Sequence, residues 1–259
     1  MENIKKILLE YRQGKINEDE VINLLKLDYI ERIDNYIQFD LFRKERKGIP
    51  EIVYAESKSE KMVIELIEKV LSKCNSIIIS RLRKEHIEEI QKYILRRQDL
   101  SYELNDHAFI MKIYKKDHQK IEKKGYVGII AAGTSDIRVA EESRMVVEEM
   151  GVNTITAYDV GIAGFHRIFE PLKVMLEKKV SVIIVVAGME GTLPGIVASL
   201  VDVPVIGVPT SVGYGFGSNG IGALTTMLQS CSLGLLVVNI DNGVGAGASA
   251  ALIALKQIS

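Results

Sequence analysis

The stretch "VSVIIVVAGMEGTLPGIVASLVDVPVIGV", residues 180–208, holds two apolar runs joined by a short segment with helical character. The runs at 180–187 and 203–208 have the length of strands, and neither alternates apolar with polar residues. Continuous apolar runs are typical of strands in a parallel sheet whose two faces are both covered by helices. The stretch therefore predicts a strand–helix–strand unit with parallel strands.

The same pattern extends in both directions from this stretch. Further apolar runs lie at 126–132, 152–158 and 233–240, and helical segments lie at 136–150, 166–179, 191–200, 220–230 and 246–257. Five strand–helix repeats predict an α/β fold with a doubly wound, mostly parallel sheet of the flavodoxin or Rossmann type.

The composition changes sharply near residue 125. All but two of the 21 glycines follow residue 124, whereas most of the 33 Lys and Arg residues precede it. Helical patterns at 18–27 and 58–73 and short strands at 51–55, 76–80 and 109–114 are typical of a small α+β unit. We therefore predict two domains, a charged α+β domain at 1–124 and a catalytic α/β domain at 125–259.

Overall composition excludes several classes of protein. The formal net charge is −1, with 47% hydrophobic and 26% charged residues, so we expect neither nucleic acid nor a membrane as a partner. The N-terminal residues "MENIKKILLE" contain no apolar core of signal-peptide length, and the longest apolar stretches are too short for a spanning helix, which favours a cytoplasmic protein. The two cysteines, Cys74 and Cys231, are expected to be free thiols.

Ligands of doubly wound sheets bind beyond the carboxyl ends of the strands, where this chain is polar and rich in glycine. After the first strand, Gly133 is expected to permit a tight turn, and Thr134, Ser135 and Asp136 open a helix. Free N–H groups at a helix start bind phosphate, but the same residues are also typical helix caps. Both interpretations of this segment stay open.

The ends of the next three strands offer further polar groups. Asp159, His166 and Arg167 follow the second strand, and the histidine is either structural or, with the arginine, part of an anion site. Glu190 follows the third strand in a turn rich in glycine, which favours a polar function over packing. After the fourth strand, "GFGSNG" (215–220) matches a dinucleotide fingerprint but stands in the wrong place, so we expect no redox cofactor.

Cys231 is predicted to lie at the end of the helix before the fifth strand. A free cysteine is commonly a small buried apolar residue, and no neighbour in the sequence supplies a cation to activate its thiol. Its position alone therefore favours a packing role.

Three motifs together resemble the aminoimidazole ribonucleotide (AIR) carboxylase family, PurE, over most of residues 125–259. They are "AAGTSD" (131–136), "AGMEGTLPGIVASLVDVPVIGVP" (187–209) and "GVGAGASAALIA" (243–254). Thr192 stands where PurE proteins have a histidine, and "IAGFHR" (162–167) differs in spacing from their "SAHR" element. These departures, the segment "GIPEIVYAESKS" (48–59) and Cys231 are similar to LarB, a PurE-related family of nickel-pincer cofactor biosynthesis.

This resemblance implies an enzyme that acts on nicotinic acid adenine dinucleotide and carbon dioxide or bicarbonate. LarB enzymes carboxylate the pyridinium ring at C5 and cleave the phosphoanhydride, giving pyridinium-3,5-biscarboxylate mononucleotide and AMP. The family uses a cysteine that adds to the ring, which implies that Cys231 is the nucleophile. Glu190 is then expected either to activate the water that cleaves the anhydride or to take the ring proton.

The expected contacts to this substrate lie at the strand ends and the first helix. They are Gly133, Thr134, Ser135, Asp136, Arg138, Asp159, His166, Arg167, Gly188, Met189, Ser211 and Gly213. Magnesium is a candidate helper at the pyrophosphate, although the sequence shows no ligand cluster and we assign no metal ligand. The resemblance also implies a homo-oligomer, an octamer as in PurE proteins.

Two other functions stay open on the sequence. One is carboxylation or carboxylate migration on AIR in purine synthesis, which would need the histidine that Thr192 replaces. The other is a nucleotide-binding protein without catalytic activity.

Overall fold

The computed structural model describes residues 2–28, 31–33, 37–39, 47–50, 52–117 and 122–258. Residues 118–121, just before the predicted domain boundary, lie outside this part. The chain divides into two compact units. The first comprises residues 1–103 and 111–118, and the second comprises residues 104–110 and 119–259.

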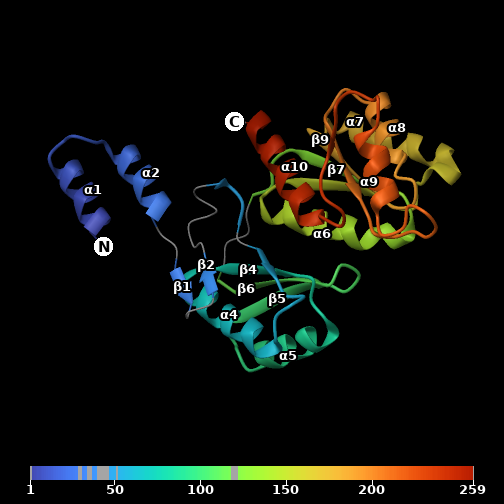
Figure 1. Cartoon of the computed structure of the whole chain (residues 1–259). Helices are drawn as coiled ribbons and strands as arrows, with labels where there is room; N and C mark the ends of the chain where they lie inside the picture. The colour runs from blue at the N-terminus through green and yellow to red at the C-terminus, as the bar shows by residue number, and fades with distance from the viewer. Residues whose placement is uncertain are drawn as a thin grey trace. The chain divides into compact units, whose positions relative to one another are not determined.

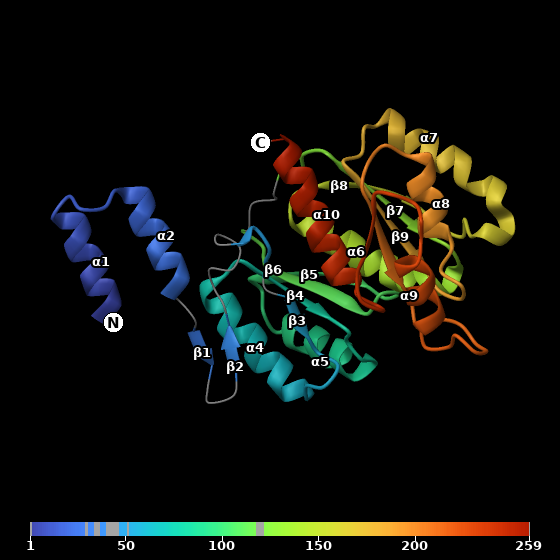
Figure 2. The ribbon, with the colours of Figure 1, turned by 45° about the horizontal axis from the view of Figure 1, so that its top comes forward.

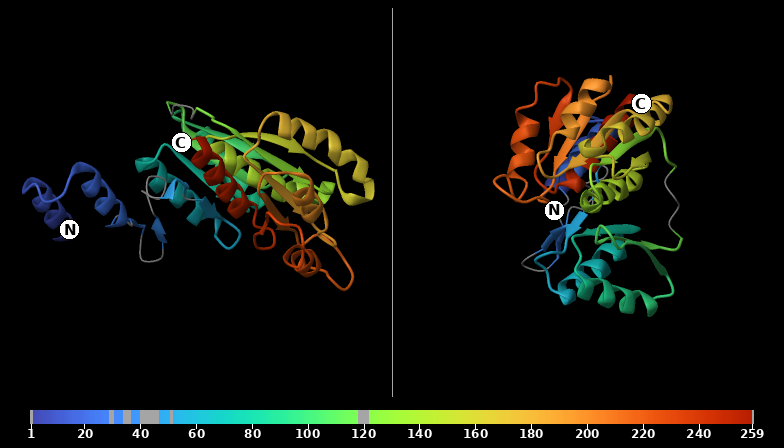
Figure 3. Two further views of the ribbon diagram at one scale, coloured as in Figure 1. Left: turned by 90° about the horizontal axis from the view of Figure 1, so that it is seen from above. Right: turned by 90° about the vertical axis from the view of Figure 1, so that its right-hand side faces the viewer.

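The first unit contains a four-stranded sheet in the order β3-β4-β6-β5. Its strands are β3 (Ile52–Tyr54), β4 (Ser76–Ser80), β5 (Leu100–Asn105) and β6 (Ile110–Lys115). Strand β4 runs parallel to β3 and antiparallel to β6. Helices α4 (Glu60–Lys73) and α5 (Lys84–Leu95) lie side by side on one face of this sheet (Figures 1 and 3).

Local sequence explains these elements. The Ser59 hydroxyl accepts a hydrogen bond from the Met62 amide at 3.3 Å, so it caps α4. Ile77 and Ile79 of β4 are buried, and so are their partners on β6, Ile113 and Met111. The N-terminal part adds α1 (Glu2–Arg12), α2 (Glu18–Asp28), β1 (Glu31–Ile33) and β2 (Ile37–Phe39), of which β1 and β2 pair antiparallel.

The second unit is built on a five-stranded, fully parallel sheet in the order β11-β10-β9-β7-β8. The strands are β7 (Tyr126–Ala131), β8 (Asn153–Ala157), β9 (Val182–Ala187), β10 (Val205–Pro209) and β11 (Leu235–Val237). Numbered from β7, this is the 2-1-3-4-5 order of flavodoxin-like folds. The predicted α/β fold class is therefore confirmed.

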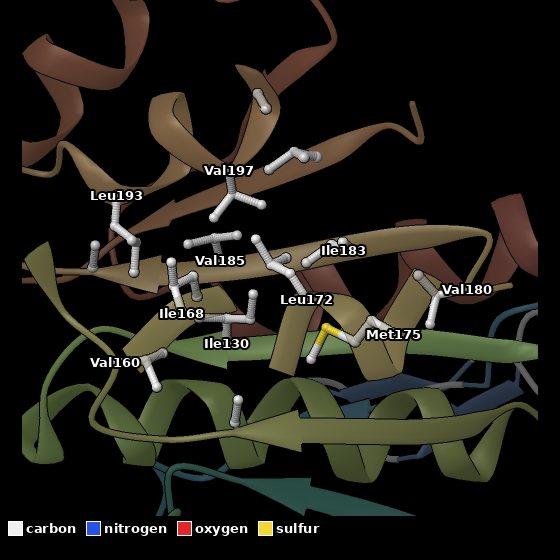
Figure 4. Packing of buried hydrophobic residues seen from close by; sticks show 14 of the residues in the cluster. Ile130, Val160, Ile168, Leu172, Met175, Val180, Ile183, Val185, Leu193 and Val197 are labelled. Atoms are coloured by element: carbon white, nitrogen blue, oxygen red, sulfur yellow. The ribbon is translucent and has the colours of Figure 1, made fainter. Parts of the chain in front are cut away.

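Helices cover both faces of this sheet, as the apolar runs predict. They are α6 (Ile137–Glu149), α7 (Phe169–Glu177), α8 (Leu193–Leu200), α9 (Ile221–Leu228) and α10 (Gly243–Ile258), with 3-10 turns η1 (Thr134–Asp136) and η2 (Ile162–Ile168). Helices α6 and α10 pack side by side against the sheet (Figure 2). Figure 4 shows the opposite face, where Ile183 and Val185 of β9 meet Leu172, Met175 and Val197. All six residues of β9 are buried because alternate side chains point to opposite layers.

A partly buried polar network lies along α6 within the second unit. The carboxylate of Glu141 accepts hydrogen bonds from Tyr158 and Asn105, and from Arg144 at 2.8 Å. Arg144 also donates to Glu148 at 3.1 Å. Burial alone would raise the pKa of Glu141, but the bonds from Arg144 and Tyr158 outweigh it and hold this pKa below its ordinary value.

The network predicts a stability that depends on pH. A lowered carboxyl pKa adds stability above the ordinary glutamate value of about 4.3, and this is lost as the pH falls through the folded-state pKa. We expect Glu141→Gln to cost about 1–3 kcal/mol at neutral pH, and the cost to shrink in acid. Thermal unfolding followed by circular dichroism from neutral to acidic pH measures the difference. Exposed Glu177, changed to Gln, is the control, and a cost from Glu141→Gln that does not vary with pH would contradict the prediction.

Candidate functional site

The loops that follow β7, β8 and β9 enclose a hollow of about 360 Å³. It lies at the carboxyl edge of the sheet, by which we mean the side where the C-terminal ends of the parallel strands lie. We call this space the Glu190 hollow. It is lined by eight of the predicted site residues, which are Gly133, Thr134, Ser135, Asp136, Asp159, Gly188, Met189 and Glu190. The topology thus brings together side chains from three separate strand ends, as the strand-end rule predicts.

The backbone is strained around this edge. Asp159, Met189 and Asp241 have positive φ angles of 57°, 48° and 54°, and they follow β8, β9 and β11. Residues other than glycine seldom adopt such angles, and those that do cluster at functional sites. This strain supports a functional role for the edge, independently of the hollow.

The residues after β7 have two different roles, because one caps the helix start and two are exposed in the hollow. The expected turn is present, because the Gly133 carbonyl accepts a hydrogen bond from the Asp136 amide at 3.0 Å, but Gly133 is extended with φ −124°, which any residue adopts, so the turn does not require glycine. The Asp136 carboxylate accepts a hydrogen bond from the Gly133 amide at 3.0 Å and so caps the helix start. Thr134 and Ser135 are exposed in the hollow, where their hydroxyls and the helix start can meet an anion.

Asp136 is only 4% exposed, and its carboxylate is held by the protein itself. One oxygen accepts a hydrogen bond from the Thr210 hydroxyl at 2.7 Å, and Gly188 contributes a backbone hydrogen bond. Burial raises the pKa of Asp136 above its ordinary value, and these hydrogen bonds only partly offset the increase. Thr210, fully buried at the end of β10, was not among the predicted site residues, although the strand-end rule points to it.

Other predicted contacts do not line the Glu190 hollow. Arg167 donates a hydrogen bond to Asp159 at 2.7 Å, and its neighbour His166 is exposed on η2. The guanidinium carbon of Arg138 lies 5.6 Å from the centre of the Phe109 ring. Ser211 and Gly213 are exposed on the loop after β10, where Val212 between them lines the hollow instead.

Cys231 is exposed and lies beyond α9, which ends at Leu228. The predictions of a helix-end position and of a packing role are therefore wrong. The chain leaves the helix because Ser230 closes the last turn onto Met227, and the Ser230 hydroxyl then accepts a hydrogen bond from the Ser232 amide at 3.2 Å. A Cβ atom on Gly195 of α8 would stand 2.9 Å from that hydroxyl, so the loop packs closely against this glycine.

A second hollow of about 520 Å³ lies beside Cys231, and we call it the Cys231 hollow. Hydroxyl side chains dominate its polar lining, and they are Thr192, Ser199, Thr225, Thr226, Ser230 and Ser232. Gly191 and Thr192 line both hollows, so the two adjoin at the start of α8. Gly191 is required there, because its φ is +64° and a Cβ atom would stand 2.6 Å from the Ala223 backbone.

Two features are absent from the part of the chain that the structure describes. The described residues contain no group of three or more His, Cys, Asp or Glu side chains arranged to hold a metal ion. Among the helices of this part, none combines the length and apolar character needed to cross a membrane.

The chain matches known families over both units. Residues 126–259 match the AIR carboxylase family, and residues 30–115 match the LarB/PurE-like N-terminal domain. An uncharacterized protein of Methanocaldococcus jannaschii is 46% identical over 254 residues, which is 97% of each chain. These matches connect the two units with one family.

Relatives with a stated activity match only the C-terminal part. An N5-carboxyaminoimidazole ribonucleotide mutase of Pyrococcus horikoshii is 37% identical over 139 residues, 52% of this chain and 72% of its own length. One of Thermotoga maritima is 36% identical over 132 residues, 49% of this chain and 73% of its own. These findings support a carboxylase-related role, and the protein belongs to the PurE-like AIR carboxylase family, with an N-terminal domain of the LarB type.

Proposed function

We propose that the protein carboxylates nicotinic acid adenine dinucleotide at C5 of its pyridinium ring and cleaves the phosphoanhydride. The products are pyridinium-3,5-biscarboxylate mononucleotide and AMP. This reaction would be one step of nickel-pincer cofactor synthesis. The observation that carries the proposal is the exposed Cys231 thiol beside a hollow of about 520 Å³, which adjoins the Glu190 hollow. A substrate with a reactive ring and a distant anhydride suits two adjoining hollows.

The chemistry requires a nucleophile because a pyridinium ring is too poor in electrons to attack carbon dioxide. In the proposed first step the Cys231 thiolate adds to C4, which forms a C–S bond and neutralises the ring nitrogen. The resulting enamine has its electron density at C5. Covalent catalysis of this kind replaces one difficult step by two easier ones.

The next steps restore the aromatic ring. The electron pair at C5 attacks the carbon of carbon dioxide, and a carboxylate forms while the ring nitrogen becomes an iminium. The proton on C5 then leaves to a base, and its electron pair neutralises the nitrogen again. Finally the C–S bond breaks, the thiolate departs with its electron pair, and the pyridinium reforms.

Glu190 is assigned to the anhydride in this proposal. It lines the same hollow as Thr134 and Ser135 at the start of α6, where an anion would bind, and it is absent from the lining of the Cys231 hollow. A carboxylate there can take a proton from the water that attacks the phosphorus atom. No ligand set for magnesium occurs among the described residues, so no step is assigned to a metal.

A second candidate is the carboxylate migration that the curated relatives' names describe. Relatives called N5-carboxyaminoimidazole ribonucleotide mutase share 30–37% identity with about half of this chain. Against it stands Thr192, a residue that cannot serve as an acid or base in place of histidine. The N-terminal domain of the LarB type also favours the first proposal.

We further propose that the chain assembles into a homo-oligomer, an octamer by resemblance. Large apolar side chains are exposed around the carboxyl edge and the Cys231 loop, and they include Tyr214, Phe216, Ile221 and Leu233. Apolar surface of this extent is typical of a face covered by another chain.

The proposal is tested by incubating the protein with nicotinic acid adenine dinucleotide and labelled bicarbonate and analysing the products by mass spectrometry. We expect a mononucleotide that has gained one carboxyl group, together with AMP. A parallel incubation with N5-carboxyaminoimidazole ribonucleotide tests the second candidate. Turnover of the latter alone would replace the proposal, and binding of either nucleotide without turnover would indicate a protein that only binds.

A further inference from the structure

Three loops that line the Glu190 hollow meet at one buried carboxylate. Asp136 accepts hydrogen bonds from the Gly133 amide at 3.0 Å and from the Thr210 hydroxyl at 2.7 Å, and from the Gly188 backbone. These three partners follow β7, β10 and β9 respectively. Because the carboxylate is 4% exposed and Thr210 is fully buried, solvent contributes little to these bonds.

The same contacts continue toward Glu190 along the chain. The Met189 amide, next to Gly188, donates a hydrogen bond to the Val212 carbonyl at 3.0 Å. Thr210 also donates its amide to the Ala187 carbonyl at 3.1 Å, so the loops after β9 and β10 are joined on both sides of Gly188. Met189 is held at a positive φ of 48°, a conformation that persists only when its surroundings enforce it.

We propose that Asp136 is a positioning residue, whose carboxylate ties the three loops together and thereby fixes the place of Glu190. Its role in turnover rests on the proposed function, in which Glu190 activates the water that cleaves the anhydride. Asp136 itself does not touch the reacting atoms in this scheme. A buried acid with protein partners at both oxygens is thus a support for the site.

Asp136→Asn and a pair of variants at Thr210 separate this role from general stability. In Asp136→Asn the charged acceptor is lost, which weakens the bond from the Gly133 amide, and the NH2 group can meet the Thr210 hydroxyl only if that hydroxyl turns to accept. Thr210→Val keeps the shape and removes the hydroxyl, whereas Thr210→Ser keeps the hydroxyl. Ser72→Ala, in α4 of the first unit, is the control for a polar change outside the junction and outside both hollows.

The first measurement is amide hydrogen exchange of the wild type and each variant, which needs no substrate. We expect exchange at residues 188–191 to be at least about tenfold faster in Asp136→Asn and Thr210→Val, with the strand amides of β7 and β9 unchanged. Thr210→Ser and Ser72→Ala should resemble the wild type. Unchanged exchange at 188–191 in both disruptive variants would overturn the inference, and if Asp136→Asn does not fold, the Thr210 pair still decides it.

The second measurement is the rate of AMP release from nicotinic acid adenine dinucleotide. A displaced Glu190 should lower kcat by about 10²-fold in Asp136→Asn and Thr210→Val, with a smaller change in KM. The double variant that combines Asp136→Asn with Thr210→Val should be no slower than Asp136→Asn alone, because both changes disrupt the same junction. Faster exchange with an unchanged kcat would refute the link to Glu190, whereas a wild type without turnover would refute the proposed function and leave the exchange result to decide the junction.

Discussion

Replacing Cys231 by serine is expected to lower kcat/KM for carboxylation of nicotinic acid adenine dinucleotide by at least about 10³-fold. The hydroxyl is a weaker nucleophile than a thiolate at neutral pH, and an alkoxide is a poor leaving group from carbon. Because Cys231 is exposed on a loop, the substitution should leave the unfolding temperature nearly unchanged. Incorporation of labelled bicarbonate measures the rate.

The chain provides a matched control in its other cysteine. Cys74 ends α4 in the first unit, and Cys74→Ser should keep the rate of carboxylation within about twofold of the wild type. Mass spectrometry of the intact protein after denaturation during turnover should detect a substrate adduct on the wild type and on Cys74→Ser, and none on Cys231→Ser. If Cys231→Ser keeps a tenth or more of the activity, the covalent mechanism is wrong.

The largest effect on folding is expected from Gly191→Ala. The left-handed backbone at φ +64° costs a residue with a Cβ atom about 1–2 kcal/mol. The new methyl group would also stand 2.6 Å from the backbone of Ala223 in α9, and such overpacking costs a further 1–3 kcal/mol or so. We therefore expect a total loss of about 2–5 kcal/mol in the free energy of unfolding, measured by urea denaturation.

Gly215→Ala separates the two contributions. Gly215 has a similar φ of +80°, but a Cβ atom there would have no neighbour within 4 Å. Its substitution should cost only the backbone strain, about 1–2 kcal/mol. If both variants lost the same free energy of unfolding, the contact between residue 191 and Ala223 of α9 would relax easily. The explanation given for Gly191 would then be wrong.

The α/β fold of the second unit was predictable because its signal is local. Most of its strands lie in runs of apolar residues, and β9, whose six residues are all buried, is the clearest case. The first unit was harder. Helices α1 and α5 and strand β5 were missed, since "KEHIEEIQKYIL" of α5 carries many charged residues among the apolar ones and half of the residues of β5, "LSYELN", are polar. Charge conceals periodicity when only one face of an element is buried.

The site was predictable by position and less so by contact. The strand-end rule led to eight residues of the Glu190 hollow, including Glu190 itself. It could not show that Asp136 points into the protein or that Arg138 lies over Phe109, because both depend on packing between distant segments. The exposure of Cys231 likewise depends on where α9 ends, and element boundaries are the least certain part of sequence-based prediction.

The strand order has a consequence for how the second unit acquires its structure. The central strand β7 pairs on one side with β8 and on the other with β9, where Val127 meets Val182. Parallel neighbours of this kind require closure of long chain segments before any pairing energy is gained, so folding is slow relative to helical proteins. Before β9 pairs with β7 during folding, the backbone of β7 on that side is open to pairing with another chain. Refolding at low protein concentration should therefore favour the native protein over aggregates.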